Sequence, residues 1–150
     1  METMDNNIIA IRKVDIKKAN EAFSDLMNTT ERILNEDSNM QPNKYKNISP
    51  DKLELFSLEK IKEACVNTPF RSENIILISG QKFPDIITEK YYGVEVKSTK
   101  GNTWTSTGSS IIESTRDEFV ENIYMLFGKL GGNPPEFRCR PYQDVLYDIA

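Results

Sequence analysis

The chain has 150 residues and a net charge of −4, with 38% hydrophobic and 28% charged residues. This composition supplies a core for one domain and excludes wholesale disorder, and no apolar run is long enough for a transmembrane helix. Histidine is absent, which excludes Ser-His-Asp and Cys-His nucleophiles and the usual zinc sites. The two cysteines, Cys65 and Cys139, lie far apart, a usage that predicts free thiols in a cytoplasmic protein.

The front of the chain is predicted to be helical, since all seven glycines lie beyond residue 79. Apolar residues at three- and four-residue spacing predict an amphipathic helix over 14–35. The polar stretch 35–47 contains a proline and is predicted to be an exposed, mobile loop. Ser49 and Pro50 form a helix cap followed by proline at the first helical position, so helix is expected over 49–66. We therefore expect an N-terminal helix and loop over 1–48 and a core over 49–150.

Strands are predicted from residue 75 onward. The apolar run 75–78 is typical of a buried strand, and 83–90 and 91–99 are rich in β-branched and aromatic residues. A loop is expected over 100–110 and a fourth strand over 136–140. Between them a helix from about 114 to 130 is expected, with an apolar face of Phe119, Val120, Ile123, Tyr124, Phe127 and Leu130. The order helix, three strands, helix, strand predicts an α/β fold with a mixed central sheet flanked by helices.

Apolar spacing resumes at 145–149, just before the last residue. Natural termini usually fade into polar residues. We therefore expect that the core is truncated at its C-terminal end and that the chain is the N-terminal part of a longer protein.

Three charged residues on two predicted strands are candidates for one site. Asp85 follows Pro84 at the start of the second strand, and Glu95 and Lys97 alternate on the third, so the latter two share a face. If the strands are hairpin neighbours, Asp85 lies beside Glu95, and two bare carboxylates there repel. A hard divalent cation resolves the repulsion, because Mg²⁺ prefers carboxylates and waters as ligands. With Lys97 to hold the attacking water and neutralise a phosphate oxygen, the set predicts metal-dependent phosphodiester hydrolysis.

The segments Phe-Pro-Asp-Ile at 83–86 and Tyr-Gly-Val-Glu-Val-Lys-Ser at 92–98 resemble the motif of the PD-(D/E)xK nuclease superfamily. The predicted element order is also similar to that superfamily's core over about 58–140, and 108–116 resembles the segment after the motif in some bacterial type II restriction endonucleases. The resemblance implies a restriction-endonuclease-like αβββαβ core. It implies that Asp85, Glu95 and the Val96 carbonyl bind Mg²⁺, with Mn²⁺ able to substitute, and that Lys97 serves the nucleophilic water.

The same resemblance implies an endonuclease that cuts double-stranded DNA to 5′-phosphate and 3′-hydroxyl ends, usually as a homodimer on a palindromic site. An acidic residue of the first core helix is sometimes an extra ligand in this superfamily. Glu59 and Glu63 are the candidates for that position in this chain, and the sequence does not separate them.

Cationic, hydroxyl and aromatic residues after the motif are candidate DNA contacts, since lysine, arginine and hydroxyls suit phosphate oxygens and tryptophan stacks on bases. These candidates are Lys100, Trp104, Thr105, Ser106, Ser109, Ser110, Arg116, Arg138 and Arg140. Such residues are equally ordinary in exposed loops, and a lone tryptophan more often covers the edge of a core. The net charge of −4 requires that a locally basic cleft and a bound metal supply the attraction to DNA.

Three functions stay open from the sequence. The first is a type II restriction enzyme, and the second is a repair or recombination nuclease with the same chemistry. The third is a non-catalytic DNA-binding or protein-interaction module in which the Asp/Glu/Lys set arises by chance. Metal-dependent cleavage separates the first two from the third.

Overall fold

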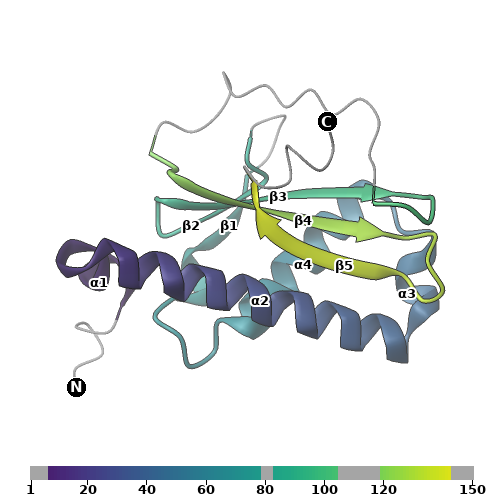
Figure 1. Ribbon diagram of the computed structural model, residues 1–150, viewed down its shortest axis with the longest axis horizontal. Coiled ribbons are helices and arrows are strands. Elements are labelled where there is room, and N and C mark those ends of the chain that lie inside the picture. The colour runs from purple at the N-terminus through teal and green to yellow at the C-terminus, as the bar shows by residue number, and fades with distance from the viewer. Residues whose placement is uncertain (1–6, 79–82, 105–118, 143–150) are drawn as a thin grey trace.

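The computed structural model describes residues 7–78, 83–104 and 119–142. Helices come first in these residues, and strands follow (Figure 1). The helices are α1 (Ile8–Val14), α2 (Ile16–Met40), α3 (Pro42–Lys46) and α4 (Pro50–Ala64), followed by the 3₁₀ turn η2 (Ser72–Asn74). The strands are β1 (Ile75–Leu77), β2 (Ile86–Thr88), β3 (Tyr92–Thr99), β4 (Asn122–Lys129) and β5 (Glu136–Pro141). The fold class is therefore α/β, as the sequence predicts.

The five strands form one mixed sheet in the order β1-β2-β3-β4-β5. Neighbours are antiparallel except β3 and β4, which run parallel with Tyr92 opposite Asn122. Adjacent parallel strands cannot be joined by a hairpin, so a longer crossover connection is required between Thr99 and Asn122. The predicted sites Thr105, Ser106, Ser109, Ser110 and Arg116 belong to this connection and lie outside the described residues.

The two faces of the sheet differ in what covers them. Helices α2 and α4 lie on one face (Figure 1), where Phe23, Leu26 and Ile61 pack against Val94, Val96 and Leu126. Residues Phe83, Val120, Ile123, Met125, Phe127 and Tyr142 form a second apolar cluster. Because side chains alternate along a strand, Glu95 and Lys97 point away from the helices, to the face of Met125 and Phe127.

The prediction of a helix over 114–130 is wrong for its described part, because residues 122–129 form strand β4. Every residue from Ile123 to Gly128 is buried. A central strand covered on both faces shows a continuous apolar run, and such a run also contains residues at helical spacing. Residues 114–118 lie outside the described residues.

The prediction of a mobile loop over 35–47 is also wrong. Helix α2 continues to Met40, and α3 carries Tyr45, which is fully buried against Phe137 of β5 with 5.2 Å between ring centroids. The Tyr45 hydroxyl donates to Asp37 Oδ2 at 2.6 Å. The N-terminal helices therefore share one core with the sheet, through contacts with residues about ninety positions away.

Two strands are smaller than predicted, and other elements are confirmed. Strand β1 is an edge strand on which Ile76 is 53% exposed, and β2 ends at Thr88 before a turn with positive φ at Glu89 and Lys90. Ser49 caps α4 by accepting from the Lys52 amide at 3.2 Å, and β3 and β5 lie where predicted. Both cysteines are free thiols. None of the helices in the described residues combines the length and apolar character needed to cross a bilayer.

Candidate functional site

The candidate site lies where β2 separates from β3. The pairing of β2 with β3 ends at Ile86, which lies opposite Val94. At the preceding residue, Asp85, a side-chain oxygen accepts the hydrogen bond that a backbone carbonyl would accept in a continued ladder. Asp85 Oδ2 accepts from the Val96 amide at 2.9 Å. In an extended strand the N–H and C=O of one residue point to the same side, so the Val96 carbonyl faces the same opening. The opening thus gathers a carboxylate and a backbone oxygen.

Two contacts fix the backbone at Asp85. The Ile78 amide donates to the Asp85 carbonyl at 2.7 Å, which ties Asp85 to the end of β1. On the other side Pro84 packs directly over Gly93, where an added Cβ would lie 2.4 Å from Pro84 Cγ. Only glycine permits this approach. The local sequence therefore holds Asp85 against β3.

Glu95 and Lys97 complete the site from β3. Glu95 is 6% exposed, and its Oε2 lies 3.5 Å from Lys97 Nζ. Glu95 Oε1 is buried and finds no hydrogen-bond donor in the described part of the chain. Leaving a buried charged oxygen without a partner is costly. The site therefore favours a positive charge next to Glu95 Oε1, either a proton or a cation.

The pKa shifts at the carboxyl pair have the same cause. Burial, followed by the charge of Asp85, raises the pKa of Glu95 to about 8, against the opposing effect of Lys97. Burial also raises the pKa of Asp85, although the Val96 amide, a hydrogen bond from the carboxyl of Glu95 when that group is protonated, and the Lys97 charge act in the opposite direction. In the metal-free protein at neutral pH the pair therefore holds a proton, and this proton must leave before both carboxylates bind a cation.

The charges of this site also affect the pKa of a third carboxyl, that of Glu54 on α4. Burial, then the charges of Asp85 and Asp51, raise the pKa of Glu54 to about 7, and Lys97 opposes the shift. Sequence reasoning missed this residue among the acids of the helix. The signal that could have found it is helical phase, since Glu54 lies seven residues before the buried Ile61 and both point toward the sheet.

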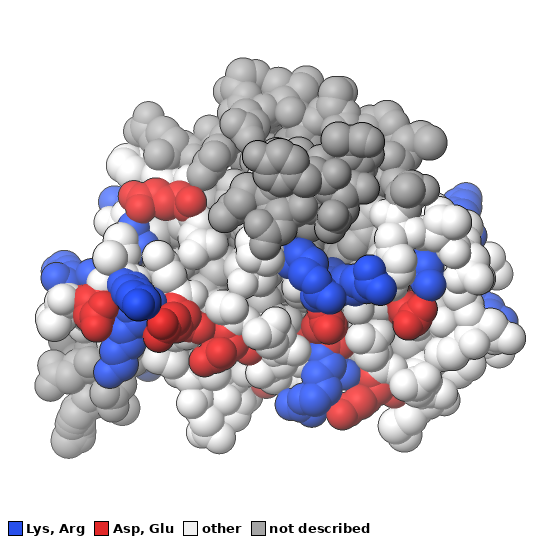
Figure 2. All heavy atoms as spheres, viewed as in Figure 1, with Lys and Arg blue, Asp and Glu red and all other residues white. Residues whose placement is uncertain are grey.

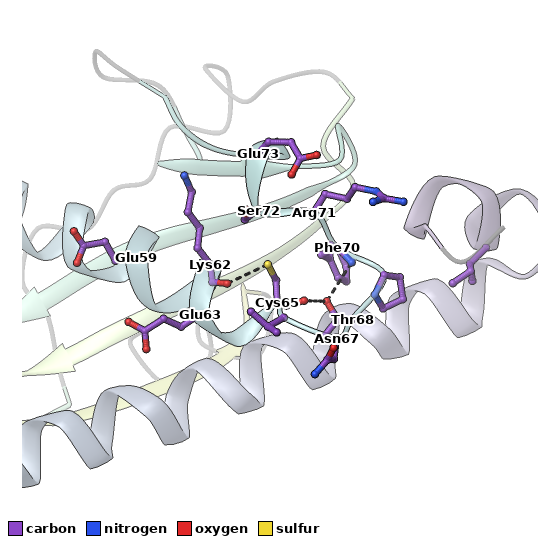
Figure 3. A pocket seen from close by; sticks show the side chains of 13 residues that line it. Glu59, Lys62, Glu63, Cys65, Asn67, Thr68, Phe70, Arg71, Ser72 and Glu73 are labelled. Atoms are coloured by element: carbon purple, nitrogen blue, oxygen red, sulfur yellow. Dashed lines mark hydrogen bonds between the residues drawn. The ribbon is translucent and has the colours of Figure 1, made fainter. Parts of the chain in front are cut away.

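The predicted extra ligands, Glu59 and Glu63, are not brought to this site. At about 100° per residue, they point about 140° and 180° away from Glu54 around α4. Both line a separate cavity of about 1040 Å³ together with Cys65 and Arg71 (Figure 3), and Glu63 pairs with Lys60 at 3.1 Å. The acid of α4 whose pKa is raised by burial and by the charge of Asp85 is Glu54.

The donor set fits a hard divalent cation with few protein ligands. In residues 7–78, 83–104 and 119–142 no three acidic or thiol side chains are grouped closely enough to hold a metal ion by themselves. Mg²⁺, however, is usually held by one or two carboxylates, with waters and substrate phosphate as its other ligands. Asp85, Glu95 and the Val96 carbonyl match that pattern, and the unpartnered Glu95 Oε1 is the atom that such a cation would satisfy.

The described candidate DNA contacts lie on or near β5, apart from Lys100, which is exposed after β3. Trp104 packs on Phe127 with 6.0 Å between ring centroids, as expected of a residue that covers a core edge. The Arg138 guanidinium lies 4.1 Å from the Trp104 ring centroid. Arg140 pairs with Glu31 of α2 at 2.7 Å. Of the two arginines, Arg140 is thus held by an acid of this chain.

Comparison with protein-family models, with curated proteins and with solved structures gives no match. A function for this site is therefore inferred from its residues, their positions and their charges.

Proposed function

We propose that this protein is a Mg²⁺-dependent DNA endonuclease of the PD-(D/E)xK kind. The observation that carries the proposal is the pair of carboxyls, Asp85 and Glu95, at the opening between β2 and β3, with Lys97 Nζ 3.5 Å from Glu95. The element order supports it, because α4 precedes three antiparallel strands and the next strand, β4, runs parallel to β3. The helix followed by three strands agrees with the first part of the restriction-endonuclease-like core that the resemblance implies, and the second helix of that core has no counterpart in the described residues.

In this proposal Asp85, Glu95 and the Val96 carbonyl hold Mg²⁺ or Mn²⁺, and Glu54 adds negative charge beside them. The bound metal would supply a hydroxide nucleophile at neutral pH and neutralise charge on the phosphate. The Lys97 ammonium donates hydrogen bonds to the attacking water or to a phosphate oxygen, and Glu95 keeps it on the correct face. Hydrolysis then leaves a 5′-phosphate and a 3′-hydroxyl.

The non-catalytic alternative accounts poorly for this arrangement. A chance set of surface charges would be solvated, whereas Glu95 is buried next to a second acid, and buried acids with raised pKa values are typical of functional sites. Within the nuclease class we propose type II restriction of foreign DNA in the cytoplasm by a homodimer, on the basis of the motif and its flanking residues. A repair or recombination nuclease would use the same site.

The test is incubation of mixed-sequence plasmid DNA with the chain, without divalent cation and with Mg²⁺, Mn²⁺ or Ca²⁺. Cleavage is expected with Mg²⁺ and Mn²⁺ but not with Ca²⁺, whose loose coordination positions the water poorly. Discrete fragments with 5′-phosphate ends would support restriction, and cuts at DNA structures rather than at sequences would support repair. Intact DNA in every arm, from chain that is folded by circular dichroism, would refute the nuclease.

A further inference from the structure

The sheet face that carries the site continues to two arginines on β5. Lys97 pairs with Phe127 in β4, and Phe127 pairs with Arg138 in β5. Residues that pair across a sheet place their side chains on the same face. At about 4.8 Å per strand, Lys97 and Arg138 lie about 10 Å apart at the level of the backbone. Basic side chains gather over β5 in Figure 2.

Arg138 differs from the basic residues around it. Lys129 pairs with Glu136 at 2.8 Å and Arg140 pairs with Glu31 at 2.7 Å, so acids of this chain neutralise both. Arg138 is exposed, and within the described residues no carboxylate lies at ion-pair distance from it. Its guanidinium lies instead on Trp104, which is itself fixed on Phe127. Among the described residues, Arg138 is thus a pre-positioned cation whose donors are not taken up by a carboxylate.

We propose that Arg138, supported by Trp104, binds a backbone phosphate of the DNA strand that is cut, about one or two nucleotides from the scissile phosphate. The proposal rests on the nuclease function proposed above. The guanidinium fork suits two phosphate oxygens at once. Each nucleotide advances about 3.4 Å along the DNA axis and also winds around it, so phosphates of one strand lie farther apart than this rise, and about 10 Å corresponds to one or two nucleotides. The subsite also supplies local positive charge to a chain whose net charge is −4.

The test measures binding rather than cleavage. Fluorescence anisotropy of a labelled 20-base-pair duplex, with Ca²⁺ present and NaCl varied, gives the affinity and its logarithmic salt slope. Arg138→Gln should bind about five- to tenfold more weakly at 0.1 M salt, with a slope reduced by about one, because one phosphate contact is lost. Arg138→Lys should keep the slope, because its charge remains.

The matched control is Arg32→Gln, which removes the same charge from a 61% exposed arginine paired with Glu36 on α2. It should leave the slope unchanged. Trp104→Phe, checked for folding by its melting temperature, should weaken DNA binding with an unchanged salt slope. The substitution removes the Trp104 ring that supports the Arg138 guanidinium, and it leaves the charge of Arg138 in place.

Three results would overturn the subsite. An unchanged slope in Arg138→Gln would do so while leaving the nuclease intact if plasmid cleavage persists. Equal losses in Arg138→Gln and Arg32→Gln would trace the effect to net charge alone. Absence of both binding and cleavage in the wild-type chain would remove the subsite and the nuclease function together.

Discussion

Glu95 is held between neighbours with opposite effects on its charge. Asp85 and burial favour its protonated form, and Lys97 favours the carboxylate. Because burial has the largest effect, the pKa rises to about 8 and the metal-free protein keeps the proton at pH 7. The unfolded chain, in which an ordinary glutamate has a pKa near 4.3, has lost that proton. Between these two values folding therefore takes up a proton.

Stability should accordingly fall as the pH rises from about 4.5 to about 8, since the native state binds more protons than the unfolded state in this window. Glu95→Gln removes the titrating group, so its melting temperature should exceed that of wild type at pH 8 and vary less with pH. At about 1.4 kcal/mol per pKa unit, the free energies of unfolding of Glu95→Gln and wild type should differ by a few kcal/mol at most. Melting curves from pH 4.5 to 8.5 measure it. Glu36→Gln, at a 62% exposed glutamate, is the control, and a Glu95→Gln profile parallel to wild type would contradict the shift.

Cleavage should depend on individual side chains in a graded way. Asp85→Ala, Glu95→Ala and Lys97→Ala should each lower the initial rate by at least about 10²–10³-fold, the usual effect of removing one charge-stabilising group. Glu54→Gln should cost about 10–100-fold, as for groups that support metal ligands. Initial rates on plasmid DNA with Mg²⁺ measure these effects.

Glu59→Gln is the matched control on the same helix and should cleave at close to the wild-type rate. A larger loss in Glu59→Gln than in Glu54→Gln would return the extra acidic role to Glu59. Near-wild-type cleavage by any of the three alanine variants would remove that residue from the site.

At the scale of elements, the sequence alone predicts those features that are determined by residues close together in the chain. The cap at Ser49 starts α4, and the short connection between β2 and β3 brings Asp85 beside Glu95, so helix and carboxyl pair both follow from nearby residues. Tyr45 is buried by Phe137, and β4 is a strand buried along its length, whose continuous apolar run is not distinguished from a helix by local periodicity. The position of Glu54 depends likewise on how α4 lies against the sheet. The contacts of Tyr45 and the strand conformation of β4 leave no local signal in the sequence, whereas helical phase is the one local signal for Glu54.

Side chains of α2 occupy the outer edge of β5. Asn35 Nδ2 donates to the Phe137 carbonyl at 3.0 Å, and Asn35 Oδ1 accepts from the Phe137 amide at 2.8 Å, as a neighbouring strand would. One turn earlier, Glu31 Oε1 accepts from the Cys139 amide at 2.8 Å. An edge strand with its outward groups occupied resists pairing with other chains. Helix α2 therefore closes this side of the sheet.

Asn35→Ala should lower the free energy of unfolding by about 1–3 kcal/mol, because it strands two backbone groups of Phe137. Urea denaturation followed by circular dichroism measures the change. Asn39→Ala, one turn later at an exposed position, should change stability by less than about 0.5 kcal/mol. Equal midpoints for the two variants would show that the paired hydrogen bonds do not support the edge.

At the scale of the whole molecule, one face of the sheet packs against the helices and the other face carries the candidate site. The helices cover the face that holds Val94 and Val96, and the charged residues of β3 lie on the other face. A substitution at the charged face therefore leaves the helix-packed core intact. This separation makes thermal stability a usable readout of what binds at the site.

Divalent cations should raise the melting temperature by mass action, by about 1.4 kcal/mol of stability at ten times Kd. Mn²⁺ should act more strongly than Mg²⁺ at such oxygen sites, and uncleaved DNA should enlarge the effect by supplying further ligands. Asp85→Asn should be more stable than wild type without metal, because a repulsive charge is gone, and should lose the response to cations. Melting series on both proteins measure this, and an equal cation response in Asp85→Asn would place the metal elsewhere.

The amide of Val96 is held by the side chain of Asp85 and not by a neighbouring strand. Its exchange with deuterium should therefore follow the state of that carboxylate, while the amides within the ladder follow the unfolding of the sheet. One proton in the backbone thus reports whether the site is intact, in solution and without DNA. Asparagine at position 85 keeps an acceptor oxygen for this proton, whereas alanine releases it, so comparing the two variants separates loss of charge from loss of the strand connection.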